Sequence, residues 1–310
     1  MGVRMRRPFA FTAPLLATLL ATVALGACRS TPDARETPPP AASATPAAAA
    51  VVPADDNLNA VLWVQRSAEY RATAETVYRA ATARLDAALK DPNWDALVPG
   101  ERANPARGLP PAVVMDIDET VLDNSPYQAR LVRDGAEYNE VTWDAWVREE
   151  RAKPVPGVLD FARAAHAKGI TVIYISNRAE HLIDPTLANL RAVGLPVKDP
   201  SVFLGLGTHV PDCEQEGSEK LCRRQLIGRN YRVLMQFGDQ LGDFAQILAN
   251  TPEARAELQA SHRGWFGERW WMLPNPTYGG WEPALFNNNW REPRGERREA
   301  KRQALDVASP

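Results

Sequence analysis

Hydrophobic and polar positions along the chain follow two different periods, which predict alternating helices and strands. Between residues 58 and 89 the apolar side chains recur at roughly helical spacing until Asp91-Pro92 stops the run, which predicts one long helix or two. Short apolar runs rich in β-branched residues predict buried strands at 112–115, 170–175 and 231–237. Helical patterns at 158–168, about 180–193 and about 218–229 lie between and beside these strands.

Strands that alternate with helices indicate an α/β fold, in which crossover helices cover a Rossmann-like parallel sheet. In such sheets ligands bind beyond the carboxyl ends of the strands, and acidic or hydroxyl residues follow all three predicted strands. Residues 119–153, rich in Tyr, Trp and charge, interrupt the alternation. We expect them to form a small, mostly helical cap over the strand ends, and residues 58–89 to form an N-terminal helical extension.

The first 56 residues have the pattern of an export signal and a linker. Three arginines precede an apolar stretch at 9–25, which ends in Leu25-Gly26-Ala27-Cys28. This tetrapeptide resembles the lipobox of bacterial lipoproteins, so residues 1–27 are interpreted as a lipoprotein signal peptide and Cys28 as the lipidated residue. An ordinary secretory signal with a chance cysteine is the alternative. Residues 28–56 are rich in Pro, Ala and Thr and predict a disordered tether.

The remaining chain is divided into a catalytic domain at 57–290 and a charged C-terminal tail at 291–310. Of the 310 residues of the whole chain, 45% are hydrophobic and 24% charged, which is ordinary for a globular protein. The net charge of −2 argues against a nucleic-acid duplex as partner. With four histidines and no Cys-x-x-Cys or His-Glu-x-x-His motif, the common zinc signatures are excluded. A catalytic metal would need carboxylate ligands, which favours Mg²⁺.

The run Asp116-Ile117-Asp118-Glu119-Thr120 follows the first predicted strand and carries the candidate chemistry. A carboxylate fixed at the end of a buried strand can attack phosphorus, and a second one two residues on can protonate the leaving oxygen. Two adjacent carboxylates repel each other, so the site needs a cation. Asp239 and Asp243, after the third strand, would complete an oxygen-only metal site.

Two further residues can interact with a phosphate at this edge of the predicted sheet. Ser176 follows the second predicted strand and offers a hydroxyl and a backbone N–H group. Lys220, early in a predicted helix, can balance the charge of the phosphoryl group and the nucleophile. An Asp-x-Asp-x-Thr run alone could also be a capped turn. Four such elements in order, each at a strand end or a helix start, make the catalytic interpretation much stronger.

These motifs resemble the haloacid dehalogenase superfamily of phosphatases, and within it the class C bacterial acid phosphatases, or lipoprotein e family of 5′-nucleotidases. The resemblance spans nearly all of the exported part. The matching blocks are residues 116–125, 175–178, 218–223, 238–244 and 273–282. The first and last of these blocks are specific to this family.

The resemblance implies a haloacid dehalogenase-like fold and a role for each matched residue. Asp116 would be the nucleophile and Asp118 the general acid/base. Mg²⁺ would be held by Asp116, the backbone carbonyl of Asp118 and Asp239, with Asp243 in support, while Ser176 and Lys220 would hold the phosphate. Only one lysine stands near position 220, where the family has several, and Gln240 stands where many relatives carry Asn.

Substrate contacts are also expected from the resemblance, because aromatic side chains of the family sandwich the base of the substrate. Trp143 and Tyr278 are the candidates, with plain packing as the alternative, and Asn124 is a further candidate contact. The predicted activity is Mg²⁺-dependent hydrolysis of nucleoside 5′-monophosphates or nicotinamide mononucleotide. A broad acid phosphatase and a non-catalytic binding lipoprotein are the alternatives.

The location and the partners of the protein complete the expectations. A lipid-anchored protein of the periplasm or outer membrane is predicted, with a small phosphomonoester and the membrane as partners. The sequence is compatible with a homodimer but does not define the oligomeric state. In an oxidising compartment Cys213 and Cys222 could form a disulfide or remain two buried thiols, and the sequence does not decide between these states.

Overall fold

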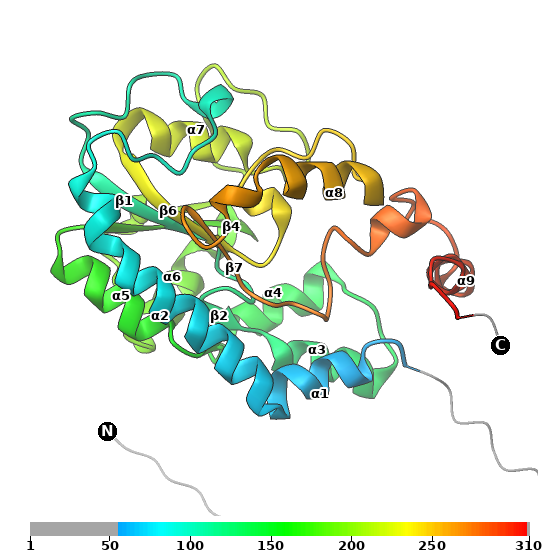
Figure 1. Cartoon of the computed structure of the whole chain (residues 1–310). Helices are drawn as coiled ribbons and strands as arrows, with labels where there is room; N and C mark the ends of the chain where they lie inside the picture. Colours follow the sequence, from blue (N-terminus) through cyan, green and yellow to red (C-terminus); the bar gives the residue numbers. More distant parts are fainter. Residues whose placement is uncertain (1–54, 309–310) are drawn as a thin grey trace, which may run out of the picture. The chain divides into compact units, whose positions relative to one another are not determined.

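The structure is a computed structural model that describes residues 55–308 (Figure 1). The predicted signal peptide, the lipidation residue Cys28 and nearly all of the predicted tether lie outside the described residues. Within the described part of the chain, no helix is long and apolar enough to cross a membrane.

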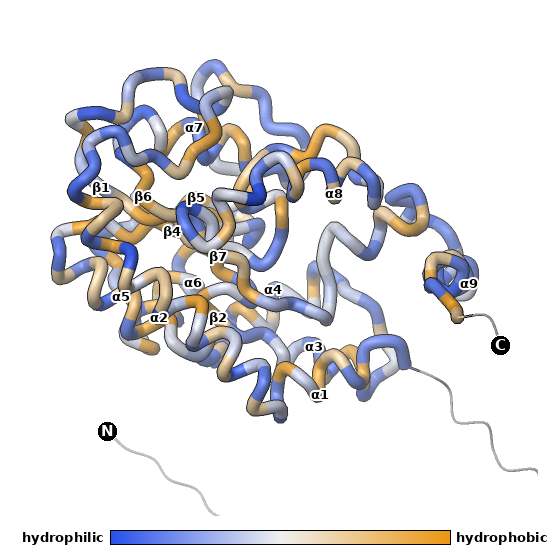
Figure 2. The backbone as a smooth tube through the Cα atoms, viewed as in Figure 1, coloured by the Kyte–Doolittle hydropathy of each residue, from blue (hydrophilic) through white to orange (hydrophobic). Residues whose placement is uncertain are grey.

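A five-stranded parallel sheet forms the centre of the fold, in the order β5-β4-β1-β6-β7. Its strands are β1 (Pro111–Met115), β4 (Thr171–Ala179), β5 (Phe203–Leu206), β6 (Arg232–Gly238) and β7 (Trp270–Met272). The predicted α/β class is therefore confirmed. β6 is buried along its whole length and appears largely hydrophobic in Figure 2. In a parallel sheet covered on both faces, such continuous apolar strands are expected.

Side chains of the central strand β1 alternate between the two faces of the sheet, as a period of two residues requires. Val113 and Met115 pack into a cluster with α2 (Ala68–Lys90) and α5 (Val158–Ala167). Ala112 and Val114 face the other way, toward Ile227 of α7 (Leu221–Asn230). Helices thus cover both faces of the sheet. Within the described residues its carboxyl edge is not covered in this way, so a functional site can form there.

The helical pattern at 58–89 corresponds to two helices, α1 (Leu58–Arg66) and α2. The helices are separated at Ser67, whose extended backbone leaves the helical conformation and whose hydroxyl accepts a hydrogen bond from Tyr70 N at 3.0 Å. A serine at this position is a typical N-cap. The sequence predicted either one long helix or two, and the Ser67 cap explains why there are two.

Residues 119–153 leave the sheet at its carboxyl edge and form two short helices. These are α3 (Ser125–Asp134) and α4 (Glu140–Arg148), and the strands β2 (Leu122–Asp123) and β3 (Lys153–Pro154) pair in antiparallel fashion at their base. The remaining helices are α6 (Ile183–Ala192), α8 (Pro252–Ser261) and α9 (Arg294–Gln303).

Three local expectations differ from the structure. Ser176 lies inside β4 rather than after it, because β4 continues to Ala179 with a register shift against β5. Lys220 is the N-cap of α7 rather than a residue within the helix. The tail at 291–310 contains the helix α9, which carries no apolar side chain larger than alanine and is attached by ion pairs such as Arg297–Glu137.

Candidate active site

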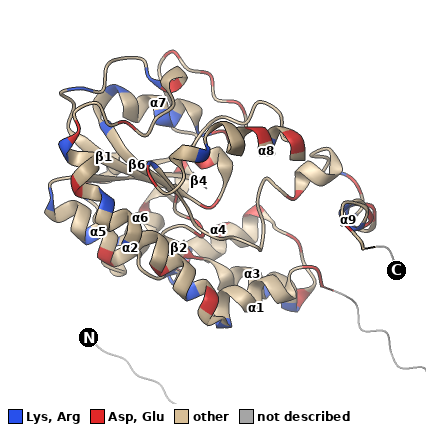
Figure 3. Cartoon of the chain, in the orientation of Figure 1, with Lys and Arg blue, Asp and Glu red and all other residues tan. Residues whose placement is uncertain are grey.

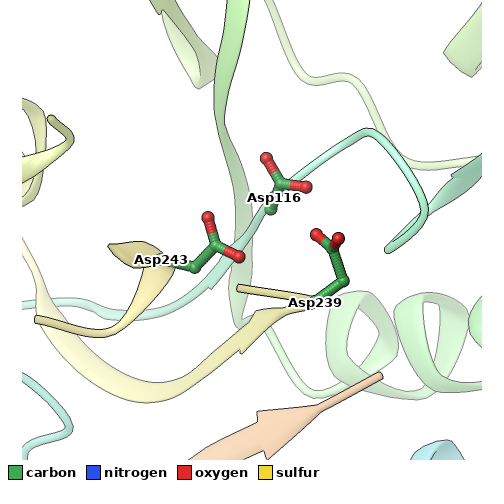
Figure 4. A group of neighbouring side chains, drawn as sticks. All are labelled: Asp116, Asp239 and Asp243. Carbon is green, nitrogen blue, oxygen red and sulfur yellow. The ribbon is translucent and has the colours of Figure 1, made fainter. Parts of the chain in front are cut away.

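Three carboxylates meet at the carboxyl edge of the sheet. Asp116 follows β1, Asp239 follows β6, and Asp243 ends the short 3-10 helix η4 (Leu241–Asp243). One oxygen of each carboxylate lies within 4.8 Å of the others (Figure 4). The strands β1 and β6 end side by side at this edge, because Asp116 N donates a hydrogen bond to Phe237 O at 2.9 Å. The three residues could hold a metal ion, and oxygen ligands suit a hard divalent cation.

Gly238, the last residue of β6, allows the strand and the turn after it to lie close together. A Cβ atom added there would collide with the side chain of Asp243. Asp243 also accepts a hydrogen bond from Gln240 N at 2.8 Å, and the two residues form a capping box at η4. The glycine and the cap together direct the Asp243 carboxylate toward Asp116.

The electrostatics of this group favour a bound cation. Burial raises the pKa of Asp116 well above its usual value, although Lys220 opposes the shift. Burial and the neighbouring Asp243 raise the pKa of Asp239 to about 7. Both shifts express the cost of several buried like charges, and a divalent cation would remove that cost by neutralising the carboxylates.

Lys220 is the cation already present in this group. Its ammonium donates to Asp116 and, at 2.6 Å, to Asp243 Oδ1, and the residue is only 5% exposed. Burial lowers the pKa of Lys220, but the two carboxylates outweigh burial and hold the pKa above its usual value. The lysine is therefore charged at neutral pH. It lies beside Asp116, and its predicted role as counter-charge to a phosphoryl group stays a prediction.

Asp118 faces the same cavity but belongs to a different set of contacts. After it the chain turns tightly, with Ile117 O accepting hydrogen bonds from three following amides and Glu119 at a φ of 60°. The carboxylate of Asp118 accepts hydrogen bonds from Asn124 Nδ2 at 2.9 Å and from Ser176 Oγ at 3.3 Å. The side chain of Asp118 is thus outside the three-carboxylate group and is held by hydrogen bonds, while its role in proton transfer stays a prediction.

Asn124 and Ser176 lie behind Asp118 rather than on the cavity wall. Both are fully buried, and Asn124 Oδ1 also accepts a hydrogen bond from Trp146 Nε1 at 2.8 Å. Ser176 Oγ accepts a hydrogen bond from Arg178 N at 3.0 Å. In this arrangement both side chains position Asp118, the predicted general acid/base. Their direct contacts with substrate and phosphate stay predictions.

Arg178 is a site residue that the sequence reasoning quoted but gave no role. It is 1% exposed, and two of its nitrogens contact Asp118 Oδ1, at 2.9 Å and 2.8 Å. Its guanidinium also lies 5.6 Å from the ring centre of Trp143. The residue therefore links Asp118 to Trp143 of α4. Its place in the Ser-Asn-Arg block was the only signal that could have found it.

Two adjacent arginines of α7 hold the loops of the site together. Arg223 donates to the carbonyl oxygens of Ser176, Ser218 and Glu219, at 2.5, 3.2 and 3.1 Å. Arg224 pairs with the buried Glu101 and donates to Gly242 O at 2.7 Å. Sequence reasoning missed both roles, because contacts to backbone carbonyls leave no spacing pattern.

The disulfide left open by the sequence is present in the structure, between Cys213 and Cys222. Cys222 is in the first turn of α7, two residues after Lys220. The disulfide therefore restrains the loop that places the ammonium group of Lys220 next to Asp116.

Reduction of this disulfide should lower both the stability and the activity. Closing a loop of this length contributes roughly 2–3 kcal/mol to the free energy of unfolding. Thermal unfolding and phosphate release should be measured with and without dithiothreitol. The double variant Cys213→Ser, Cys222→Ser should show the reduced values in both conditions. Wild-type protein that is indifferent to the reductant would contradict this role.

The site opens into a cavity of about 1310 Å³. The three carboxylates, Asp118 and Lys220 line it, together with the predicted substrate contacts Trp143 and Tyr278. Trp143, in α4, packs edge-on against Tyr127 with ring centres 5.2 Å apart. The hydroxyl of Tyr278 contacts the carboxylate of Glu119. Both aromatic side chains are only partly buried, so one surface of each remains available to a ligand.

A carboxylate at the end of β1, a second carboxylate held by Arg178, a buried lysine and three carboxylates that could hold a metal ion form an arrangement that fits a phosphomonoesterase. Comparisons with known proteins agree. The family model described as HAD superfamily, subfamily IIIB (acid phosphatase) matches residues 24–281. The chain belongs to this acid phosphatase family.

Solved structures support the same assignment. The chain is similar to the class C acid phosphatase from Bacillus anthracis, with 32% identity and a TM-score of 0.70 over 82% of this chain and 98% of that chain. A tungstate-bound structure of that enzyme gives 33% identity, the same TM-score and the same coverage of both chains. The resemblance to class C acid phosphatases is thereby confirmed, and the non-catalytic alternative is set aside.

Proposed function

We propose that this acid phosphatase hydrolyses nucleoside 5′-monophosphates or nicotinamide mononucleotide with Mg²⁺ as cofactor. The observation that carries the proposal is the pairing of a buried carboxylate site with the two partly exposed aromatic rings, Trp143 and Tyr278, in one cavity. A ring of the substrate can stack on such side chains while its phosphate reaches Asp116. A phosphatase for small alkyl phosphates would not need the aromatic wall.

In the proposed reaction an oxygen of Asp116 attacks the phosphorus atom, and the bond to the ester oxygen breaks. Asp118 gives its proton to the leaving nucleoside oxygen, which leaves the phosphoryl group on Asp116. Asp118 then takes a proton from water, whose oxygen attacks the phosphorus and releases phosphate and free Asp116. Lys220 offsets the charge of the phosphoryl group throughout.

Asp116, Asp239 and Asp243 would hold Mg²⁺, since they offer neighbouring carboxylate oxygens of the type that this ion binds. When bound, the ion would neutralise the phosphate and orient it for attack. Export and attachment through Cys28 stay predictions, and the distribution of Cys28→Ser protein between membrane and soluble fractions would test them.

The substrate preference is tested by comparing adenosine monophosphate with glycerol phosphate. We expect kcat/KM to be higher for the nucleotide. Replacing Tyr278 by Leu should lower that preference about tenfold, because one base–aromatic contact is lost. Trp143→Leu should act in the same direction. Trp63→Leu, on α1 and away from the cavity, is the matched control. Equal efficiency on the two substrates would leave a broad acid phosphatase as the function.

A further inference from the structure

A half-buried arginine, Arg255, lies on the cavity wall outside the group of carboxylates. It belongs to α8, and its Nη1 donates to Asn250 Oδ1 at 3.0 Å. Among the described residues, no carboxylate forms an ion pair with it, although most other charged side chains of the cavity wall are paired. Arg298, Lys301 and Arg297, for example, each face an acidic residue.

The guanidinium of Arg255 is partly removed from water without a counter-charge. Burial lowers its pKa, and no neighbouring acid opposes the shift. An unpaired charge in such a place costs free energy, which an anion bound in the cavity would recover. The active centre does not use this residue, and its hydrogen-bond partner Asn250 carries no charge.

The position of Arg255 is fixed by its neighbours. Asn250, which accepts its hydrogen bond, donates to Gly280 O at 2.9 Å and to Asn288 Oδ1 at 2.5 Å. A Cβ atom on Gly280 would lie only 2.9 Å from Arg255 Nη1, so the absence of a side chain allows the guanidinium to lie against the backbone. The arginine is therefore held in place before any ligand arrives.

The segment at 278–280 connects Arg255 with the reaction centre. Gly280 N donates to Gln240 Oε1 at 3.0 Å, and Gln240 Nε2 donates to the metal-site residue Asp239 at 2.7 Å. Tyr278, the proposed ring contact, stands two residues before Gly280. A ligand that stacks on Tyr278 with one end at Asp116 therefore has Arg255 within the same cavity.

The size and charge of the cavity leave room for a larger substrate. Its volume of about 1310 Å³ exceeds the roughly 300–1,000 Å³ of most small-molecule pockets. Its outer wall includes Arg294 and Arg302 of α9, a helix whose Lys and Arg are shown in blue in Figure 3. The other cations of this helix on the wall, Arg297, Arg298 and Lys301, are balanced by acidic partners. An anionic group pointing away from Asp116 would thus meet positive charge.

We propose that Arg255 anchors a second anion site, and that the preferred substrates are nucleotides with a second phosphate in addition to the one that is cleaved. The inference rests on the proposed nucleotidase function and deepens it. A planar guanidinium with free donors is well suited to a phosphate group. No bond changes at Arg255, and the cleaved phosphate is the one at Asp116.

The test compares adenosine monophosphate with adenosine 2′,5′-bisphosphate and 3′,5′-bisphosphate, with products identified by chromatography. For at least one bisphosphate, kcat/KM of the wild-type enzyme should be about tenfold higher than for the monophosphate, mainly through KM. Arg255→Gln should bring this ratio to about one, and Arg255→Lys, which keeps the charge, should retain part of it. The ratio is taken within each variant, so a general loss of activity or stability cancels.

Arg263→Gln, an exposed arginine just after α8 and away from the cavity, is the matched control and should keep the wild-type ratio. A wild-type enzyme without preference for either bisphosphate, or a preference that survives in Arg255→Gln, would overturn the inference. If the proposed nucleotidase function itself were wrong, the result would differ. The kcat/KM for adenosine monophosphate would then be no higher than that for glycerol phosphate, whatever residue stands at position 255.

Discussion

Asp116→Asn should reduce the turnover of any phosphomonoester by about 10⁴-fold or more, because a carboxamide cannot replace the attacking carboxylate. The residue lies at the end of β1 with its amide bonded to Phe237 O, and Asn preserves that backbone contact and the side-chain volume. Phosphate release from 4-nitrophenyl phosphate measures the loss.

The same variant should not be destabilised. The pKa of Asp116 is raised in the folded protein, so its ionised form is disfavoured by folding, and near neutral pH the charge lowers the free energy of unfolding. Asn removes that charge, while Lys220 keeps its contact with Asp243. The thermal midpoint should be unchanged or higher. Asp160→Asn, an exposed carboxylate of α5, is the control. A fully active Asp116→Asn enzyme would refute the assigned nucleophile.

Removal of divalent metal should abolish activity, and Mg²⁺ should restore it. The expectation follows from three neighbouring carboxylates, two buried and one half-buried, that have one lysine in contact with them among the described residues. Asp239→Asn removes one charged ligand and should raise the Mg²⁺ concentration for half-maximal activity by at least about 100-fold, since even indirect partners of a metal contribute 10- to 100-fold. Activity after chelation and titration with Mg²⁺ provides the measurement.

Mg²⁺ should also raise the thermal midpoint of the wild-type protein, because an ion that binds only the folded state stabilises it. This rise should be much smaller in Asp239→Asn. Asp184→Asn, an exposed residue of α6, should behave as wild type in both assays. Full activity of wild-type protein after exhaustive chelation would show that the carboxylate group has another role.

The central fold could be predicted because its strands are short, apolar and bounded by turns, a pattern that physical burial imposes on a parallel sheet. The same logic placed Asp116 and Asp239 together, since the carboxyl ends of neighbouring parallel strands meet. β5 was missed because a four-residue strand that contains Gly205 gives almost no periodic signal. α9 was missed because ion pairs, and not apolar packing, hold it.

Parts of the site were beyond the reach of sequence reasoning for a different reason. Arg178, Arg223 and Arg224 look like ordinary surface charges in the sequence, yet all three are at most 1% exposed. Their partners are carboxylates and backbone carbonyls that come close only after folding. Spacing can predict which residues do chemistry at strand ends. It cannot predict which distant side chains hold those residues still.

The ion pair between Asp56 and Arg298 lies in the wall of the cavity that a substrate enters. It joins the first residues of the described chain to the last helix, and both partners line the cavity. The start of the described chain and α9 therefore belong to the same wall of the cavity. Two segments that are 242 positions apart in the sequence thus build one side of the space that a substrate occupies.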